Sequence, residues 1–154
     1  MDFSGLKNAK PSDKGIYLSP GEYDVEILKV QIIKTRGKGD AFVADFKVTA
    51  ASEKLAEGQA ANHPVGSTRN YYQGLADTDI AWPELKRFTY AVLGASTAED
   101  KAKVDENIEK VFDAIDKGNT TVFTGKKAHA SVVHRTTKLN KREIDALNWQ
   151  VLGA

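Results

Sequence analysis

The first clear pattern in the chain is an alternation of apolar and polar residues near its start. Apolar side chains occupy the odd positions from Tyr23 to Ile27 and alternate with acidic residues, a period typical of a half-buried β-strand. At Leu28 the phase changes, and the even positions from there to Ile32 become the apolar ones. One extra residue produces such a change, so we expect a β-bulge near Leu28–Lys29 that bends the strand.

Similar patterns predict four more strands around a helical segment. Apolar residues recur at helical spacing at Leu85, Phe88 and Val92, and Thr97 is placed to cap a second helix. Gly94 and Gly118 follow the two helical stretches, as glycines at helix ends commonly do. The further strands are expected at residues 41–50, 67–75, 126–137 and 143–152.

The order of these elements predicts a fold class. Three strands, then helices, then a closing hairpin, with a bent first strand, indicate a mainly β protein with a helical insertion (α+β), a five-stranded OB-fold barrel. The helices lie between strands three and four. We expect an N-terminal arm at residues 1–20 and a single OB-fold domain at residues 21–154, with the helical insertion at about 79–117.

The composition limits the number of domains and the cellular compartments that we expect. The chain has 154 residues, enough for one domain, and contains no cysteine, which fits a reducing compartment such as the cytoplasm. No apolar run approaches the roughly 20 residues that span a bilayer. The first residues, MDFSGLKNAK, lack the apolar centre of a signal peptide, so we expect no membrane partner.

Charge is balanced overall but unevenly distributed. The chain carries 22 basic and 21 acidic residues, yet six cations and no acid lie between Lys126 and Arg142. No acid lies between Glu26 and Asp40 either, whereas residues 79–116 hold nine acids and five bases. In an OB-fold, the loop between strands one and two and the loop between strands four and five flank the face that binds oligonucleotides. We therefore interpret the two basic stretches as sides of a groove for a phosphate backbone.

The residues that we predict to contact nucleic acid are these cations and one aromatic ring. Tyr71 and Tyr72 are adjacent on the third strand, so they point to opposite faces, and the outward ring could stack a base. We assign that role to Tyr71, because Arg69 shares its face. The alternatives are that both rings pack in the core and that the lysines only solvate turns. The predicted set is Lys29, Lys34, Arg36, Lys38, Arg69, Tyr71, Lys126, Lys127, Arg135, Lys138, Lys141 and Arg142.

Four segments, "YLSPGEYDVEILKV", "HPVGS", "KRFTYAVLG" and "VVHRTTK", resemble phage-encoded OB-fold single-stranded-DNA-binding proteins of replication and recombination. The resemblance implies a protein that coats single-stranded DNA with little sequence preference. It also implies a host-cytoplasmic setting alongside replication or recombination proteins. Many such proteins end in an acidic tail that recruits partners, whereas this chain ends in "NWQVLGA".

Two other classes of function remain open. Asp45-Phe46-Lys47 matches the acid-x-Lys core of a nuclease superfamily, and Glu26 or Asp40 could add a metal carboxylate, but the usual Pro-Asp partner is missing. The three histidines are too scattered for a zinc site, so we predict no catalytic residue, metal or cofactor. The barrel could instead serve a phage structural or adaptor protein through protein contacts, and a homo-oligomer is compatible with the sequence.

Overall fold

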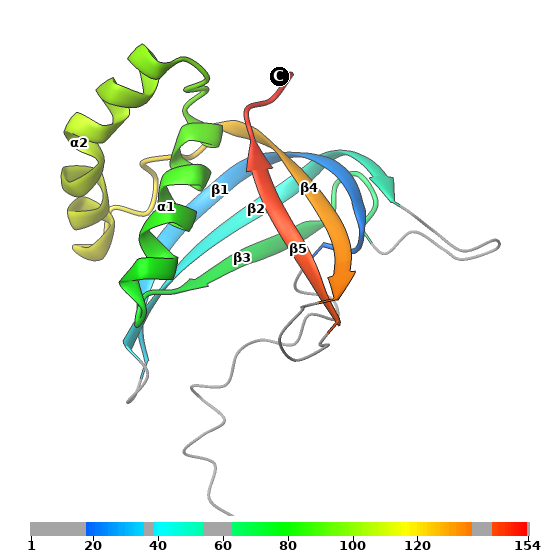
Figure 1. The fold of residues 1–154 in the computed structure, drawn as a ribbon, viewed down its shortest axis with the longest axis horizontal. Coiled ribbons are helices and arrows are strands. Elements are labelled where there is room, and N and C mark those ends of the chain that lie inside the picture. Colours follow the sequence, from blue (N-terminus) through cyan, green and yellow to red (C-terminus); the bar gives the residue numbers. More distant parts are fainter. Residues whose placement is uncertain (1–17, 36–38, 54–62, 137–142, 154) are drawn as a thin grey trace, which may run out of the picture.

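The computed structural model describes residues 18–35, 39–53, 63–136 and 143–153 (Figure 1). Of the expected N-terminal arm, residues 1–17 lie outside the described part, whereas Leu18 is buried in the core. The elements, in chain order, are β1 (Gly21–Thr35), β2 (Gly39–Glu53), β3 (Thr68–Gly74), α1 (Thr78–Val92), α2 (Ala98–Asp116), β4 (Lys127–Thr136) and β5 (Glu143–Gln150).

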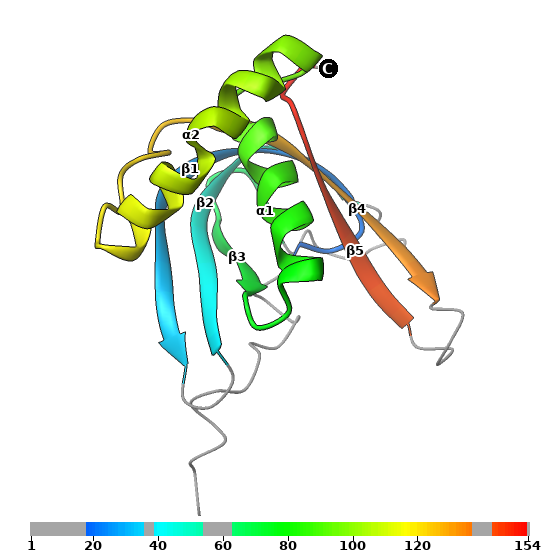
Figure 2. The same ribbon diagram turned by 60° about the vertical axis from the view of Figure 1, so that its left-hand side comes forward.

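The five strands form one antiparallel sheet in the order β3-β2-β1-β4-β5. β1 is central: it pairs with β2 along its length, and its first residues, Gly21 to Glu26, also pair with β4. The sheet curls into a half-barrel, and α1 lies on its open side between β3 and β5 (Figure 2). The protein is thus mainly antiparallel β with two helices, as the sequence predicts.

β1 bends at a β-bulge, and the position of this bulge confirms the prediction from the change of phase. The register of the β1–β2 ladder shifts between Ile27 and Lys29, so that Leu28 has no partner on β2. The Thr124 hydroxyl donates a 2.8 Å hydrogen bond to the Leu28 carbonyl and so satisfies this unpaired group. The Leu28 side chain is 36% exposed, and the buried phase resumes only at Val30. The expectation that Leu28 already belongs to the new core phase is therefore wrong.

Helix α1 covers the core with the face that its spacing predicts. Leu85, Phe88 and Val92 are all buried. At its start, the Asp77 side chain accepts a 3.1 Å hydrogen bond from the Asp79 N–H, which satisfies one of the free donors of the first turn. Two features therefore stabilise α1, the N-cap at its first turn and the apolar face that packs on the core.

Helix α2 is attached more lightly. Thr97 caps it as predicted, its hydroxyl accepting a 3.1 Å hydrogen bond from the Asp100 N–H. Gly118 ends it with a φ of 106°, a conformation that favours glycine. Along α2 only Ile115 is fully buried, while Phe112 is partly buried against the core. Most of α2 is therefore surface. No helix in the described part of the chain has the length and apolar character to cross a membrane.

The core is centred on an aromatic cluster around Phe88 of α1. Its ring centroid lies 5.3 Å from that of Phe42 on β2, 5.6 Å from Tyr71 on β3 and 5.1 Å from Trp149 on β5. Phe123, which precedes β4, lies 5.9 Å away. Such pairs contribute about 0.5–1.5 kcal/mol each beyond the burial of their area. One helical side chain therefore holds three strands and a loop.

The burial of Tyr71 corrects the prediction that this ring faces outward and stacks a base. Its side chain is 5% exposed and stacks on Phe88 at an interplanar angle of 18°. Its hydroxyl donates a 3.2 Å hydrogen bond to Gln73 Oε1, so the polar end of the ring is satisfied. Because successive side chains of a strand point to opposite faces, Tyr72 is turned to the other side, where it is half-buried.

The two tyrosines should therefore differ in their effect on stability. Tyr71→Ala should lower the free energy of unfolding by about 3–5 kcal/mol, because it leaves a cavity among packed rings. Tyr72→Ala is the matched control and should cost about 1 kcal/mol or less. Urea unfolding followed by circular dichroism would measure both. Equal losses for the two variants would contradict the burial of Tyr71.

Candidate nucleic-acid interface

The face of the sheet turned away from the core, here called the outer face, contains three lysines, two of which belong to the predicted set. Strand pairing places Lys127 of β4, Glu26 of β1 and Lys47 of β2 next to one another in a row across the sheet. The adjoining row contains Lys29 of β1 and Asp45 of β2. Lys29 and Lys127 belong to the predicted set, whereas Lys47 does not.

The lysines of the outer face are only weakly neutralised. Lys29 Nζ lies 4.0 Å from Asp45 Oδ2, and these side chains are 52% and 33% exposed, so this ion pair is weak. Lys47 and Lys127 are exposed, and neither forms an ion pair with a carboxylate in the described part of the chain. Lys126, also exposed, directly precedes β4, and its carbonyl accepts a 2.8 Å hydrogen bond from the Ile27 N–H.

Two side chains of β3 complete the outer face. Tyr72 pairs with Val43 of β2, and Asn70 pairs with Asp45, so both follow the outward phase of their strand. The Asn70 Oδ1 atom is buried and has no hydrogen-bond partner. A buried acceptor without a donor costs about 1–3 kcal/mol. The outer face therefore combines cations with a half-buried ring.

Lys34, another member of the predicted set, does not belong to the outer face, and its role in nucleic-acid binding stays a prediction. After the bulge its position follows the inward phase, and its Nζ donates to Asp40 Oδ2 at 2.9 Å and to Asp116 Oδ1 at 2.8 Å. These two hydrogen bonds, the stronger from Asp116, raise the pKa of Lys34. The residue thus links the β1–β2 hairpin to the end of α2, on the helix side of the sheet.

Arg69 is also placed differently from the prediction. It shares the core-side phase of Tyr71, and its Nε donates a 2.9 Å hydrogen bond to His63 Nδ1. Its Nη1 donates a 2.7 Å hydrogen bond to the Thr68 carbonyl. The guanidinium therefore helps to hold the segment before β3, on the core-side phase rather than on the outer face, and its role as a phosphate contact stays a prediction.

His63 is the centre of a buried polar network. It is 2% exposed, and since its Nδ1 accepts from Arg69, the proton resides on Nε2, which donates to Ser19 Oγ at 3.1 Å. The main-chain N–H of His63 donates to both carboxylate oxygens of Glu53 at 3.2 Å. The network thus joins the residues before β1, the end of β2 and β3. A nucleophilic role for Ser19 has no support here, because His63 donates to this hydroxyl rather than accepting from it.

The remaining predicted cations are not tested by the described residues. Arg36, Lys38, Lys138, Lys141 and Arg142 lie outside them, and of Arg135 only the backbone, in β4, is described. The ends of the β1–β2 and β4–β5 hairpins to which these segments connect project to the same side of the molecule (Figure 2).

Of the carboxylates in the nuclease alternative, Glu26 lies on the outer face with Asp45 and Lys47, whereas Asp40 does not. Asp45 points to the outer face, whereas Asp40 contacts Lys34 on the helix side. Among the described residues, no group of three or more histidine, aspartate or glutamate side chains could hold a metal ion. The nuclease alternative therefore keeps Glu26, Asp45 and Lys47 on one face, and it stays a prediction.

Comparison with known proteins adds no assignment: no protein-family model matches the chain, and no curated protein is significantly similar to it. The outer face must therefore be interpreted from its own geometry.

The His63 network predicts a pH dependence of stability. Burial, and then the charge of Arg69, lowers the pKa of His63 below its ordinary value of 6.5. Between the two pKa values, His63 is therefore protonated in the unfolded chain but neutral in the folded protein. The stabilisation is complete above about pH 6.5 and is lost as the pH falls through the lower pKa of the folded state.

Thermal unfolding between about pH 7.5 and pH 5 should reveal this loss, and the non-titrating variant His63→Gln should show a flatter profile over that range. His134→Gln, at an exposed histidine, is the control and should keep the wild-type slope. A His63→Gln profile as steep as that of the wild type would show that other groups cause the acid sensitivity.

Proposed function

We propose that the protein binds single-stranded nucleic acid, foremost single-stranded DNA, along the outer face. The observation that carries this proposal is the presence of Lys29, Lys47 and Lys127 on the same face as the half-buried ring of Tyr72. Lysines supply contacts to phosphates, and an aromatic ring stacks bases irrespective of sequence. A duplex hides its base faces, so this combination favours single strands.

We further propose that the curled sheet is an OB-fold barrel with a helical insertion between β3 and β4. In support, β3 and β5 are the two edges of the described sheet and lie on either side of α1. In this arrangement the ends of the β1–β2 and β4–β5 hairpins would flank the bound strand, as in oligonucleotide-binding OB-folds. A protein of this kind would act in phage DNA replication or recombination, in the host cytoplasm.

The outer face also contains four carboxylates, Glu22, Asp24, Glu26 and Asp45, so it has no net positive charge. Three lysines of the strands, Lys29, Lys47 and Lys127, face these four carboxylates, and two of the four, Glu22 and Asp24, lie next to His129. We therefore expect the described face to contribute a modest electrostatic term and the ring of Tyr72 to contribute a comparable non-electrostatic one. This balance can be measured, because only the first part depends on salt.

Removing one lysine should weaken binding to all sequences alike. Lys47→Ala and Lys127→Ala should each reduce the slope of log affinity against log salt by about 0.7 units, the value for one lost phosphate contact on a single strand. Tyr72→Ala should cost about 1–3 kcal/mol of binding without changing that slope. Fluorescence titration of a labelled oligothymidine at several salt concentrations would measure the affinity and the salt slope of all three variants.

Lys110→Ala, at an exposed lysine of α2, is the matched control for these variants. Losses in Lys110→Ala as large as those on the outer face would contradict the proposed location.

Asp45→Asn should separate binding from the nuclease alternative. Since the Asp45 carboxylate lies among the lysines and repels phosphate, its neutralisation should strengthen binding by about two- to fivefold at low salt. A metal-dependent nuclease that used Asp45 would instead lose cleavage. Incubation of wild type and variant with a labelled single strand and Mg²⁺, followed by electrophoresis, would show cleavage. Weaker binding by the variant would contradict a repulsive role for this carboxylate.

A further inference from the structure

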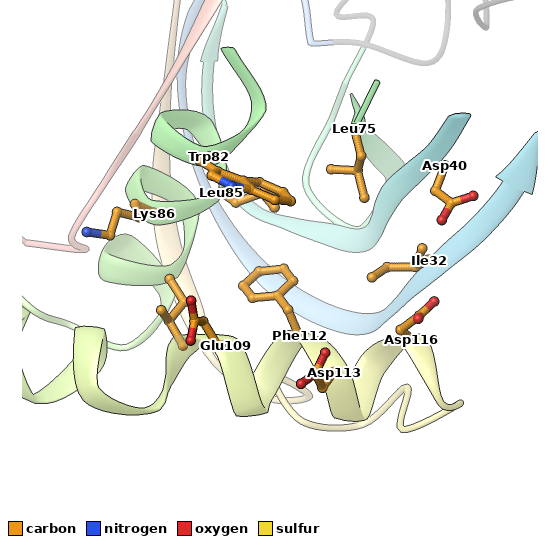
Figure 3. A pocket seen from close by; sticks show the side chains of 11 residues that line it. Ile32, Asp40, Leu75, Trp82, Leu85, Lys86, Glu109, Phe112, Asp113 and Asp116 are labelled. Atoms are coloured by element: carbon orange, nitrogen blue, oxygen red, sulfur yellow. The ribbon is translucent and has the colours of Figure 1, made fainter. Parts of the chain in front are cut away.

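A second surface feature lies on the helix side of the sheet, opposite the outer face. A groove of about 540 Å³ opens between α1, α2 and the end of the β1–β2 hairpin (Figure 3). Its volume is in the range of sites that bind small molecules or a few side chains of a peptide. Its apolar lining consists of Ile32, Leu75, Trp82, Leu85, Ile108 and Phe112.

Trp82 is the most unusual part of this lining. Its side chain is 53% exposed, and its ring shares the groove with Phe112 of α2 (Figure 3). Ile80, also on α1, is 60% exposed. An exposed tryptophan beside an apolar hollow is the kind of side chain that anchors protein interfaces when a partner covers it.

The rim of the groove is acidic. Asp40, Glu109, Asp113 and Asp116 line it, together with one cation, Lys86. Lys86 is already engaged, with its Nζ 3.3 Å from an oxygen of Asp105.

Only some of the carboxylates of this rim form ion pairs among the described residues. Lys34 binds Asp40 and Asp116 together, which closes the hairpin end of the groove. Glu109 and Asp113 are exposed and form no ion pair with a cation among the described residues. The negative charge that remains for a ligand is therefore concentrated on α2, beside the ring of Phe112.

We propose that this groove binds a short basic and apolar segment of a partner protein. An aliphatic or aromatic side chain of the partner would cover Trp82 and Phe112, and a lysine or arginine would reach Glu109 and Asp113. Amphipathic segments bind apolar grooves in this manner, with acidic rims selecting basic partners. The same carboxylates would repel a phosphate backbone, so the groove and the outer face call for ligands of opposite charge. This proposal does not depend on the proposed function.

The test uses the full-length protein and a fluorescein-labelled helical peptide of about twelve residues, with leucine at i, i+3, i+4 and i+7 and lysine or arginine elsewhere. We expect saturable binding that weakens as salt rises. Trp82→Ala should reduce the affinity by about tenfold or more, as loss of an interface anchor does. Glu109→Gln and Asp113→Asn should each reduce it by about two- to fivefold, the range for one exposed ion pair.

Matched variants and peptides distinguish binding in the groove from non-specific binding of the peptide to the protein surface. Glu106→Gln, at an exposed α2 carboxylate outside the groove lining, and Val65→Ala, at a 65% exposed side chain elsewhere, should bind the peptide as the wild type does. A peptide with glutamate in place of its cations should not bind. Equal binding of the two peptides, or equal losses in the control and groove variants, would overturn the proposal. Sedimentation that showed a dimer abolished by Trp82→Ala would overturn it too, by making the occupant a second copy of this chain.

Discussion

The fold depends on side chains closing a sheet whose backbone does not close. β3 and β5 are the two edges of the described sheet, and hydrogen bonds join each of them to one neighbour only. The ring of Tyr71 on β3 lies 5.4 Å from that of Trp149 on β5, and Phe88 of α1 contacts both. Buried aromatic contact therefore replaces a backbone ladder at this gap. Because α1 is fixed by the same contacts, the position of one wall of the acidic groove follows from them.

A second constraint holds the start of β3 and the entry to β1 together. The imidazole of His63 accepts from Arg69 and donates to Ser19, so it must be neutral to serve both. The Tyr23 hydroxyl donates a 2.7 Å hydrogen bond to the Ser19 carbonyl and extends the network toward the core. Such a network is strong only while every member is satisfied, which makes its protonation state a condition of the local structure. The orientation of β3, and with it the outward direction of Tyr72, depends on this condition.

The strand phases, the bulge, the Thr97 cap and the buried face of α1 could be predicted from the sequence, because each is a local pattern. Which face of β3 packs against the core could not be predicted. Alternation sorts Tyr71 and Tyr72 onto opposite faces but does not say which face meets the core, and that choice depends on Phe88 and Trp149, which are distant in the chain. Arg69 and Tyr71 do share one face of β3, as the sequence predicts, but this face is turned toward the core.

The same limit applies to the positions of the cations. Lys34 looks free in the sequence because its partner Asp116 lies 82 residues away. Lys47 lies on the outer face, although the predicted set does not include it. A signal for Lys47 was present, since Phe46 follows the buried phase of β2 and its neighbours must then point outward. Charge density along a sequence locates basic segments, whereas strand register decides which of their charges share a face.

Among the described residues, the charged side chains differ between the two sides of the sheet. Three lysines, Lys29, Lys47 and Lys127, lie on the outer face together with four carboxylates, whereas carboxylates of α2 line a groove on the helix side. Lys34 contributes to this difference, because its two ion pairs turn a basic residue of β1 toward the acidic side. At physiological salt, charges act over about 8 Å, so ligands on opposite sides of the sheet would interact little by electrostatics. A nucleic acid and a basic partner could then occupy the protein together, and binding of the second would depend on the first only through the shared aromatic core.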